Sequence, residues 1–254
     1  MKADLKSFLD EKYRQYSDRI FIENDPITVP HQYSQKEDIE IAGFLTATIA
    51  WGQRKTIINN ANRLISWMDN APYEFMLNSR EEELEIFKTF VHRTFHGSDC
   101  YFFIKRLRTM YQSGSSLEEL FTQGYKKHHS IAGAIVSFRQ QFLNGEHLVR
   151  TEKHISNPEK NAAAKRLNMY LRWMVRDMDN SIDFGIWKHI PASALMCPLD
   201  VHTSSVSKKL GLLKRKQPDW KAVEELTGQL RKLDPDDPVK YDIPLFALGA
   251  FEGF

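Results

Sequence analysis

Apolar residues recur every three or four positions along most of the chain, which is the spacing of helices that bury one side. The runs begin near Leu5 and continue to Leu248, and short polar stretches rich in Pro, Asp and Ser separate them. Short β-branched segments that alternate apolar and polar residues are missing from the sequence. The pattern therefore predicts an all-α protein.

The apolar spacing also sets the expected elements. We expect helices over residues 5–16, 99–111, 131–143, 161–178 and 220–233, and a helical segment over 81–90. Ser34 to Glu37 has the form of a capping box, and Ser115 to Glu119 predicts a second helix start. Asp234 to Pro238 predicts a rigid turn.

Asp200 stands between Pro198 and a run that predicts a helix. Val201, Val206 and Leu210 recur at helical spacing after it, so Asp200 occupies the N-cap position. The helix dipole and free backbone amides stabilise a carboxylate at that position. Asp200 could simply start the helix, or it could present a fixed, ionised carboxylate to a site.

The predicted helix from Asn161 to Met178 has an unusual polar side. The segment from Lys160 to Arg176 contains no acid and five cations, namely Lys160, Lys165, Arg166, Arg172 and Arg176. At helical spacing Lys165, Asn168, Arg172 and Arg176 fall on one stripe, near Tyr170 and Trp173. A cationic stripe of this kind suits a polyanion such as nucleic acid. Pairing with Asp177, Asp179, Asp183 or acids elsewhere in the fold explains it equally well.

Lys165 follows three alanines at the expected start of this helix. The positive end of the helix dipole disfavours the charged form of a lysine placed there. A neutral amine is a nucleophile toward electrophilic carbon, as in Schiff-base enzymes. A nearby carboxylate could accept its proton, and Asp200 is the candidate. The alternative is an ordinary surface lysine.

These residues carry a resemblance to a known family. Lys165 to Leu171, followed by Pro198-Leu199-Asp200-Val201-His202-Thr203, resembles the helix-hairpin-helix, Gly/Pro-rich, Asp (HhH-GPD) superfamily of DNA glycosylases. In that superfamily a lysine opens the second helix of the hairpin and an aspartate caps a later helix. The separation of thirty-five positions resembles that of archaeal 8-oxoguanine DNA glycosylases. Residues 165–176 and 183–187 also resemble an uncharacterised bacterial family that we place in the same superfamily.

Two further segments support the resemblance, which covers residues 37–254. Ile41 to Trp51, the turn around Gln53 and the next apolar run resemble an early helix, a Gln-bearing turn that reaches into the damaged duplex, and the following helix. Lys240 to Gly249 resembles the terminal helix. One departure is that residues 156–161 lack the glycines of the usual Leu-Pro-Gly-Val-Gly hairpin. Asn can adopt left-handed backbone angles, so a phosphate-binding turn remains open.

The resemblance implies an all-α, two-lobed HhH-GPD DNA glycosylase-like fold with a cleft between the lobes. The six-helix lobe would span residues 34–180, including the hairpin, and residues 1–33 with 185–254 would form the second lobe of one compact unit. The implied activity is excision of a damaged base, an oxidised purine by analogy, from double-stranded DNA. Lys165 would attack C1′ and form a Schiff base, Asp200 would stabilise the charge on the sugar, and β-elimination would cut the strand. The residues that would contact DNA are Trp51, Gln53, Arg54, Lys55, Lys160, Asn161, Arg166, Asn168, Arg172, Trp173 and His202.

Composition narrows the expected environment. The net charge of +2 and the pI near 8.4 are only mildly basic, so nucleic-acid binding would rely on a local surface. Cys100 and Cys197 are too few for a four-cysteine iron–sulfur site, and His92 and His96 lack a third ligand, so we expect no cofactor and no metal. The start of the chain has no signal-peptide core, and the longest apolar stretch is too short to span a bilayer. We expect a cytoplasmic, nucleoid-associated monomer with no membrane partner.

Two other functions stay open at this point. The same fold could bind DNA or RNA without catalysis, which the missing hairpin glycines favour. It could also be a hydrolase that acts on another nucleotide-like substrate. Lys165 together with Asp200 favours the glycosylase.

Overall fold

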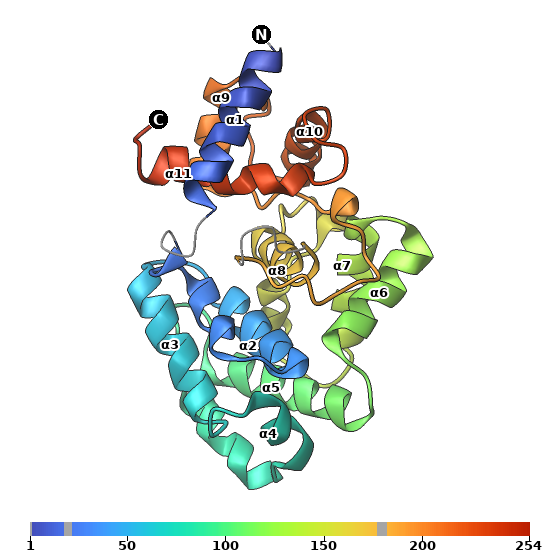
Figure 1. The fold of residues 1–254 in the computed structure, drawn as a ribbon. Helices are drawn as coiled ribbons and strands as arrows, with labels where there is room; N and C mark the ends of the chain where they lie inside the picture. Colours follow the sequence, from blue (N-terminus) through green and yellow to red (C-terminus); the bar gives the residue numbers. More distant parts are fainter. Residues whose placement is uncertain (1, 18–21, 177–181) are drawn as a thin grey trace. The chain divides into compact units, whose positions relative to one another are not determined.

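The computed structural model describes residues 2–17, 22–176 and 182–254, and its regular elements in these ranges are all helical (Figure 1). The α-helices are α1 (Lys2–Tyr16), α2 (Lys36–Thr48), α3 (Arg54–Ser66), α4 (Pro72–Asn78), α5 (Gly97–Gln112), α6 (Leu117–His128), α7 (Ile131–Phe142), α8 (Lys165–Val175), α9 (Val201–Lys209), α10 (Trp220–Leu230) and α11 (Asp242–Ala250). The 3-10 helices are η2 (Pro26–Thr28), η3 (Pro30–Gln32), η4 (Glu81–Thr89), η5 (Val149–His154), η6 (Pro158–Lys160), η7 (Ala192–Ala194) and η8 (Pro238–Tyr241). The predicted all-α class is confirmed. Within the same ranges, no helix is long and apolar enough to cross a membrane.

The chain divides into two compact units. The first comprises residues 1–23, 130–132 and 157–254, and the second comprises residues 24–129 and 133–156. Everything from Asn157 onward thus groups with the C-terminal helices, whereas the expected six-helix lobe extended to residue 180. The expected lobes stay a prediction, and the two units are described separately.

The first unit is built around α8, α9 and α11. α11 packs against both α9 and α1 (Figure 1). Gly249 allows the close approach of α9, because a Cβ atom there would lie 2.9 Å from the Cβ of His202. The apolar side of α8, with Leu167, Leu171 and Met174, is buried as the spacing predicts.

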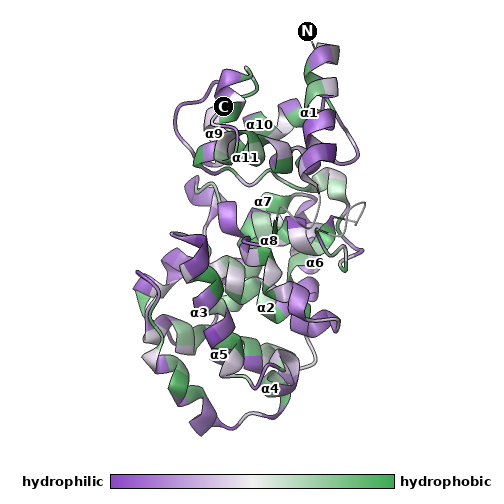
Figure 2. Ribbon diagram, turned by 60° about the vertical axis from the view of Figure 1, so that its left-hand side comes forward, coloured by the Kyte–Doolittle hydropathy of each residue, from purple (hydrophilic) through white to green (hydrophobic). Residues whose placement is uncertain are grey.

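The second unit has an aromatic core. The ring of Phe44 on α2 lies 6.0 Å from Phe103, 5.6 Å from Phe138 and 5.4 Å from Phe142, so α2, α5 and α7 share one cluster. Figure 2 shows hydrophobic and hydrophilic residues interspersed along these helices, as expected for elements that bury one side.

The element boundaries agree with the sequence pattern only in part. Ser116 caps α6 as predicted, because its Oγ accepts a hydrogen bond from the Glu119 amide at 3.2 Å. The predicted capping box before α2 is wrong, since Gln35 is the N-cap and its side chain makes no cap hydrogen bond. The segment predicted to be helical from residue 161 starts its α-helix at Lys165, because Ala164 adopts a left-handed conformation.

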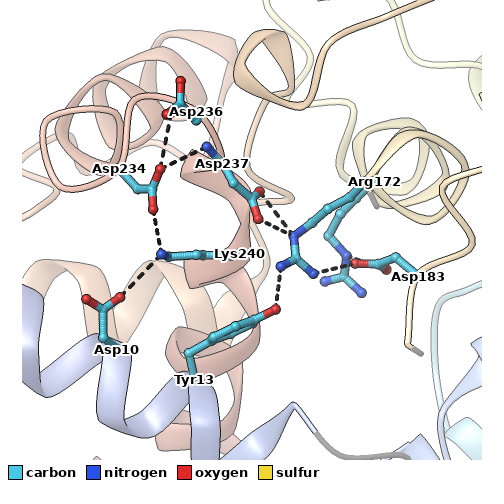
Figure 3. A network of polar contacts seen from close by, with 9 residues as sticks. Asp10, Tyr13, Arg172, Asp183, Asp234, Asp236, Asp237 and Lys240 are labelled. Atoms are coloured by element: carbon cyan, nitrogen blue, oxygen red, sulfur yellow. Dashed lines mark hydrogen bonds and ion pairs between the residues drawn. The ribbon is translucent and has the colours of Figure 1, made fainter. Parts of the chain in front are cut away.

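A buried charge cluster joins the end of α8 to α1 and to the turn before α11. The guanidinium of Arg176 contacts Tyr13, Asp183 and Asp237. Figure 3 labels these three partners. Its Nη1 lies 3.0 Å from Asp183 and its Nε lies 2.8 Å from Asp237, while Nη2 donates to the Tyr13 hydroxyl. Burial opposes the charge of Arg176, but the two carboxylates outweigh burial and raise its pKa.

The predicted rigid turn supports this cluster. Asp234 Oδ1 accepts hydrogen bonds from the amides of Asp236 at 3.1 Å and Asp237 at 3.0 Å, which confirms the turn. The other oxygen of Asp234 pairs with Lys240, which also lies 3.4 Å from Asp10 of α1 (Figure 3). The turn therefore presents Asp237 to Arg176 from a fixed backbone.

Replacing Arg176 with methionine should lower the free energy of unfolding by about 3 kcal/mol, because it leaves a buried carboxylate without its cation. Urea denaturation followed by circular dichroism measures this loss. Arg80→Met is the matched control, since Arg80 pairs with Glu83 at an exposed position and should cost less than about 1 kcal/mol. Equal losses in the two variants would contradict the importance of the buried cluster.

Candidate functional site

The segment before α8 contains two residues in the left-handed conformation, and neither of them is a glycine. Asn161 and Ala164 both have positive φ angles, of 61° and 49°. The side-chain amide of Asn161 donates to Asp219 Oδ2 at 2.8 Å. The backbone carbonyl oxygen of Asn161 accepts a hydrogen bond from the Trp220 amide at 3.1 Å. Asn161 adopts the left-handed conformation that the sequence left open for an asparagine in this segment, while that of Ala164 was not anticipated. The turn is thus pinned to the start of α10.

Lys165 is the first residue of α8 and is partly exposed. The N-cap, Ala164, provides no side-chain hydrogen bond to the helix start. Among the residues that the structure describes, none forms a hydrogen bond or an ion pair with the Lys165 amine. The amine is therefore not engaged by the surrounding fold.

Asp200 is the N-cap of α9, as its place in the sequence predicts. Its Oδ1 accepts a hydrogen bond from the Thr203 amide at 2.7 Å. Its side chain is partly exposed, and its second oxygen has no hydrogen-bond partner in the described part of the chain. The cap fixes the carboxylate while leaving one oxygen available.

A third residue, Asp242, connects these two positions. It begins α11, is 6% exposed, and was not identified from the sequence. Burial raises the pKa of Asp242 to about 6, and the negative charge of Asp200 adds to this rise. Arg172 and Lys165 act in the opposite direction. Thr203 bonds both Asp200 and Asp242, and Arg172, on the helix that Lys165 begins, pairs with Asp242, so Asp242 connects the two segments.

Cys197 lies against this carboxyl. Its thiol is fully buried, and Sγ is 3.8 Å from Asp242 Oδ1. Burial raises the pKa of the Cys197 thiol well above its ordinary value, and the charge of Asp242 adds to this rise. Burial similarly raises the pKa of Cys100, in the second unit. Neither cysteine is a candidate nucleophile, because the reactive form is the thiolate.

The two distal arginines of α8 are paired inside the first unit. Arg172 donates to Asp183 at 3.2 Å and to Asp242 at 2.5 Å, and Arg176 forms the cluster described above. Of the two explanations for the cationic stripe, the structure supports internal pairing for both guanidiniums. Asp177 and Asp179, the other acids considered, lie outside the described residues.

The remaining predicted contacts of the first unit separate by exposure. Trp173 and Asn168 are 0% and 1% exposed, and the Asn168 side chain donates to the Ala163 carbonyl at 3.2 Å. Neither side chain is therefore accessible from the surface. Lys160 and His202 are exposed, and the ring of His202 lies edge-on against Phe246. Burial lowers the pKa of Arg166 to about 10, although part of its side chain still reaches solvent.

The predicted residues of the second unit lie in the turn before α3, for Trp51 and Gln53, and in its first turn, for Arg54 and Lys55. Gln53 is the N-cap of α3 and is exposed with Lys55, whereas Trp51 and Arg54 are partly exposed.

Two buried histidines hold this turn. His92 approaches the Trp51 carbonyl at 3.1 Å, and the ring of His154 stacks on the Trp51 indole at 6.1 Å. His92 pairs with Phe95 in an isolated bridge, and His96 is the N-cap of α5, so the two histidines do not lie on one helix. No group of three or more possible metal ligands occurs in the described ranges.

The described residues thus form an all-helical fold in which Asp242 links the helix begun by Lys165 to the helix capped by Asp200. The chain belongs to the family described as protein of unknown function (DUF2400), whose profile matches residues 25–251. A comparison with curated proteins gave no match, and a comparison with solved structures gave none either. The matched range includes Lys165, Asp200 and Asp242.

Asn161 provides a test of the turn. Asn161→Gly removes the side-chain bond to Asp219 but keeps the left-handed angle, and should cost about 1 kcal/mol of unfolding free energy. Asn161→Ala also strains the backbone and should cost about 2 kcal/mol. Thermal and urea unfolding measure the order. An alanine variant as stable as the glycine variant would show that the backbone angle carries no cost.

Proposed function

We propose that this protein is a DNA glycosylase with AP lyase activity, in an HhH-GPD-like fold. The observation that supports the proposal is that one buried acid, Asp242, links the helix begun by Lys165 to the helix capped by Asp200, within a single unit. The fold class and the N-cap position of Asp200 agree with the resemblance. The left-handed Asn161 also weakens the argument from the missing glycines, because it supplies a conformation that glycine would otherwise provide.

In the proposed reaction the Lys165 nitrogen attacks C1′ of the damaged nucleotide. The bond between C1′ and the base breaks, and the base leaves with the bonding electrons and gains a proton. Asp200 stabilises the positive charge that develops on the sugar and accepts a proton from the lysine nitrogen. The C1′–O4′ bond then breaks as the nitrogen lone pair forms the imine, and O4′ takes up a proton. The imine acidifies C2′, so the C2′ proton and then the 3′ phosphate are lost, which cuts the strand.

The proposed partner is double-stranded DNA with a base that is extruded from the stack. The exposed residues Lys160 and His202 in the first unit, and Gln53 and Lys55 in the second, are the contacts retained in the proposal. Arg172, Asn168 and Trp173 are left out because the protein interior already occupies them. An oxidised purine is the first lesion to test, by analogy with the archaeal spacing. The protein would act as a monomer at the nucleoid.

Borohydride trapping on duplexes that contain 8-oxoguanine or an abasic site tests the proposal. The wild-type protein should give a covalent adduct, and Lys165→Ala should abolish it, because borohydride fixes only the imine. Asp200→Asn should slow adduct formation by about 100-fold, through loss of charge stabilisation. Lys221→Ala is the matched control, since Lys221 is exposed on α10 and lies outside the site.

Three results would change the conclusion. An undiminished adduct in Lys165→Ala would remove Lys165 from the mechanism. Tight binding without adduct or released base, across a panel of lesions, would support a DNA- or RNA-binding protein that uses the same fold. Release of a base without any adduct would indicate a hydrolytic reaction.

A further inference from the structure

Asp242 is a buried acid whose contacts reach three separate segments. Its Oδ2 accepts a hydrogen bond from Arg172 Nη1 at 2.5 Å, and its Oδ1 accepts one from the Thr203 hydroxyl at 3.3 Å. Oδ1 also lies 3.8 Å from the Cys197 thiol. A buried carboxylate with this many donors is held in one orientation.

Two of these contacts lead to the candidate site. Arg172 lies on α8 seven residues, or two helical turns, beyond Lys165, so the two side chains leave the same side of the helix. Thr203 gives its hydroxyl to Asp242 and its backbone amide to Asp200, at 2.7 Å. Asp242 therefore ties the helix that carries Lys165 to the helix start that carries Asp200.

The charges that face Asp242 come from these same segments. Arg172 and Lys165 approach it from α8, Asp200 approaches it from the start of α9, and Cys197 approaches it from the segment before α9. Elements α1 and η8 also pack against α11.

Four titratable groups of α1 and η8, namely Lys6, Asp10, Lys240 and Tyr241, form a cluster of their own. Elsewhere on α1, Tyr13 bonds Arg176, and Lys12 and Tyr16 bond Glu252. Tyr241 donates to Asp10 at 2.9 Å, and Lys6 and Lys240 pair with the same carboxylate. They engage one another, so the surroundings of Asp242 are set by α8 and α9.

We propose that Asp242 is a positioning residue that, through Arg172 and Thr203, holds in one arrangement the two helix starts that carry Lys165 and Asp200. This proposal rests on the glycosylase proposal for its consequence in catalysis. When Asp242 takes up a proton, the ion pair with Arg172 is lost and the connection between the two helices weakens. The pKa of Asp242, raised by burial to about 6, places this change within an accessible pH range.

The test compares Asp242→Asn with the wild type in single-turnover trapping between pH 5 and 8. The wild-type rate should fall as the pH drops through about 6. Asp242→Asn, which keeps the shape but not the charge, should be about 10- to 100-fold slower at pH 7.5, as expected for misplaced reacting groups. Its rate should no longer change with pH near 6. Asp242→Glu, which restores the charge, should recover part of the rate and the pH dependence.

Asp237→Asn is the matched control. Asp237 is also a largely buried acid of the first unit, with a pKa raised by burial, but it pairs with Arg176 rather than with the site. This variant should lose stability and keep both the wild-type rate and the fall near pH 6. An Asp242→Asn enzyme with the wild-type rate and pH profile would overturn the proposal. So would an Asp237→Asn enzyme that shows the same loss.

A second measurement needs no DNA and separates this proposal from the glycosylase proposal. Reductive methylation with formaldehyde, followed by mass spectrometry, reports the labelling rate of each lysine in the intact protein. In Asp242→Asn the rate at Lys165 should change by about threefold or more, because the start of α8 loses the contact between Asp242 and Arg172 that fixes its surroundings. The rate at Lys221 should not change, and neither rate should change in Asp237→Asn. An unaltered Lys165 rate would overturn the link, whether or not the wild type forms an adduct on DNA.

Discussion

Pairing of Arg172, on α8, and of Arg176, the C-cap of that helix, with acids of the first unit is the interaction on which that unit depends. Arg172 and Arg176 meet acids from the segment after α8, the turn before α11 and the start of α11. A buried ion is costly unless it is matched, so these acids can be satisfied only when α8 lies in one orientation. Apolar packing favours burying that helix, and the charges select how it is turned. At the start of α8, the pairing of Arg172 with Asp242 is the one that bears on Lys165, which lies on the same side of the helix.

Much of the local structure could be predicted from the sequence. Helical spacing of apolar residues identified the all-α class, and the order of proline, aspartate and apolar residues identified Asp200 as a cap. The start of α8 could not be predicted, because alanine has a high helix propensity and rarely adopts the left-handed angle of Ala164. Segment 81–90 was expected to be helical, and a 3-10 helix covers Glu81–Thr89. In both places tertiary contacts decide details that local preferences leave open.

The candidate site was predictable only where its residues carry a local signature. Lys165 and Asp200 stand in recognisable settings, whereas Asp242 looks like any helix-starting acid until its burial is known. The role of the cationic stripe likewise could not be predicted from the sequence alone. A sequence gives the sign of each charge but not the group that lies opposite, so Arg172 and Arg176 suggested a polyanion as readily as an internal partner. Their partners lie up to seventy residues away along the chain.

Each unit contains one buried cysteine, whose reaction with a thiol reagent can report local unfolding of that unit. Cys100 belongs to the second unit and Cys197 to the first, and both thiols are sealed from solvent with their ionisation suppressed. A thiol reagent can reach either one only when the surrounding helices separate. The labelling rate at each cysteine therefore measures how often its unit opens, and comparison of the two rates tells whether the units unfold together or one at a time.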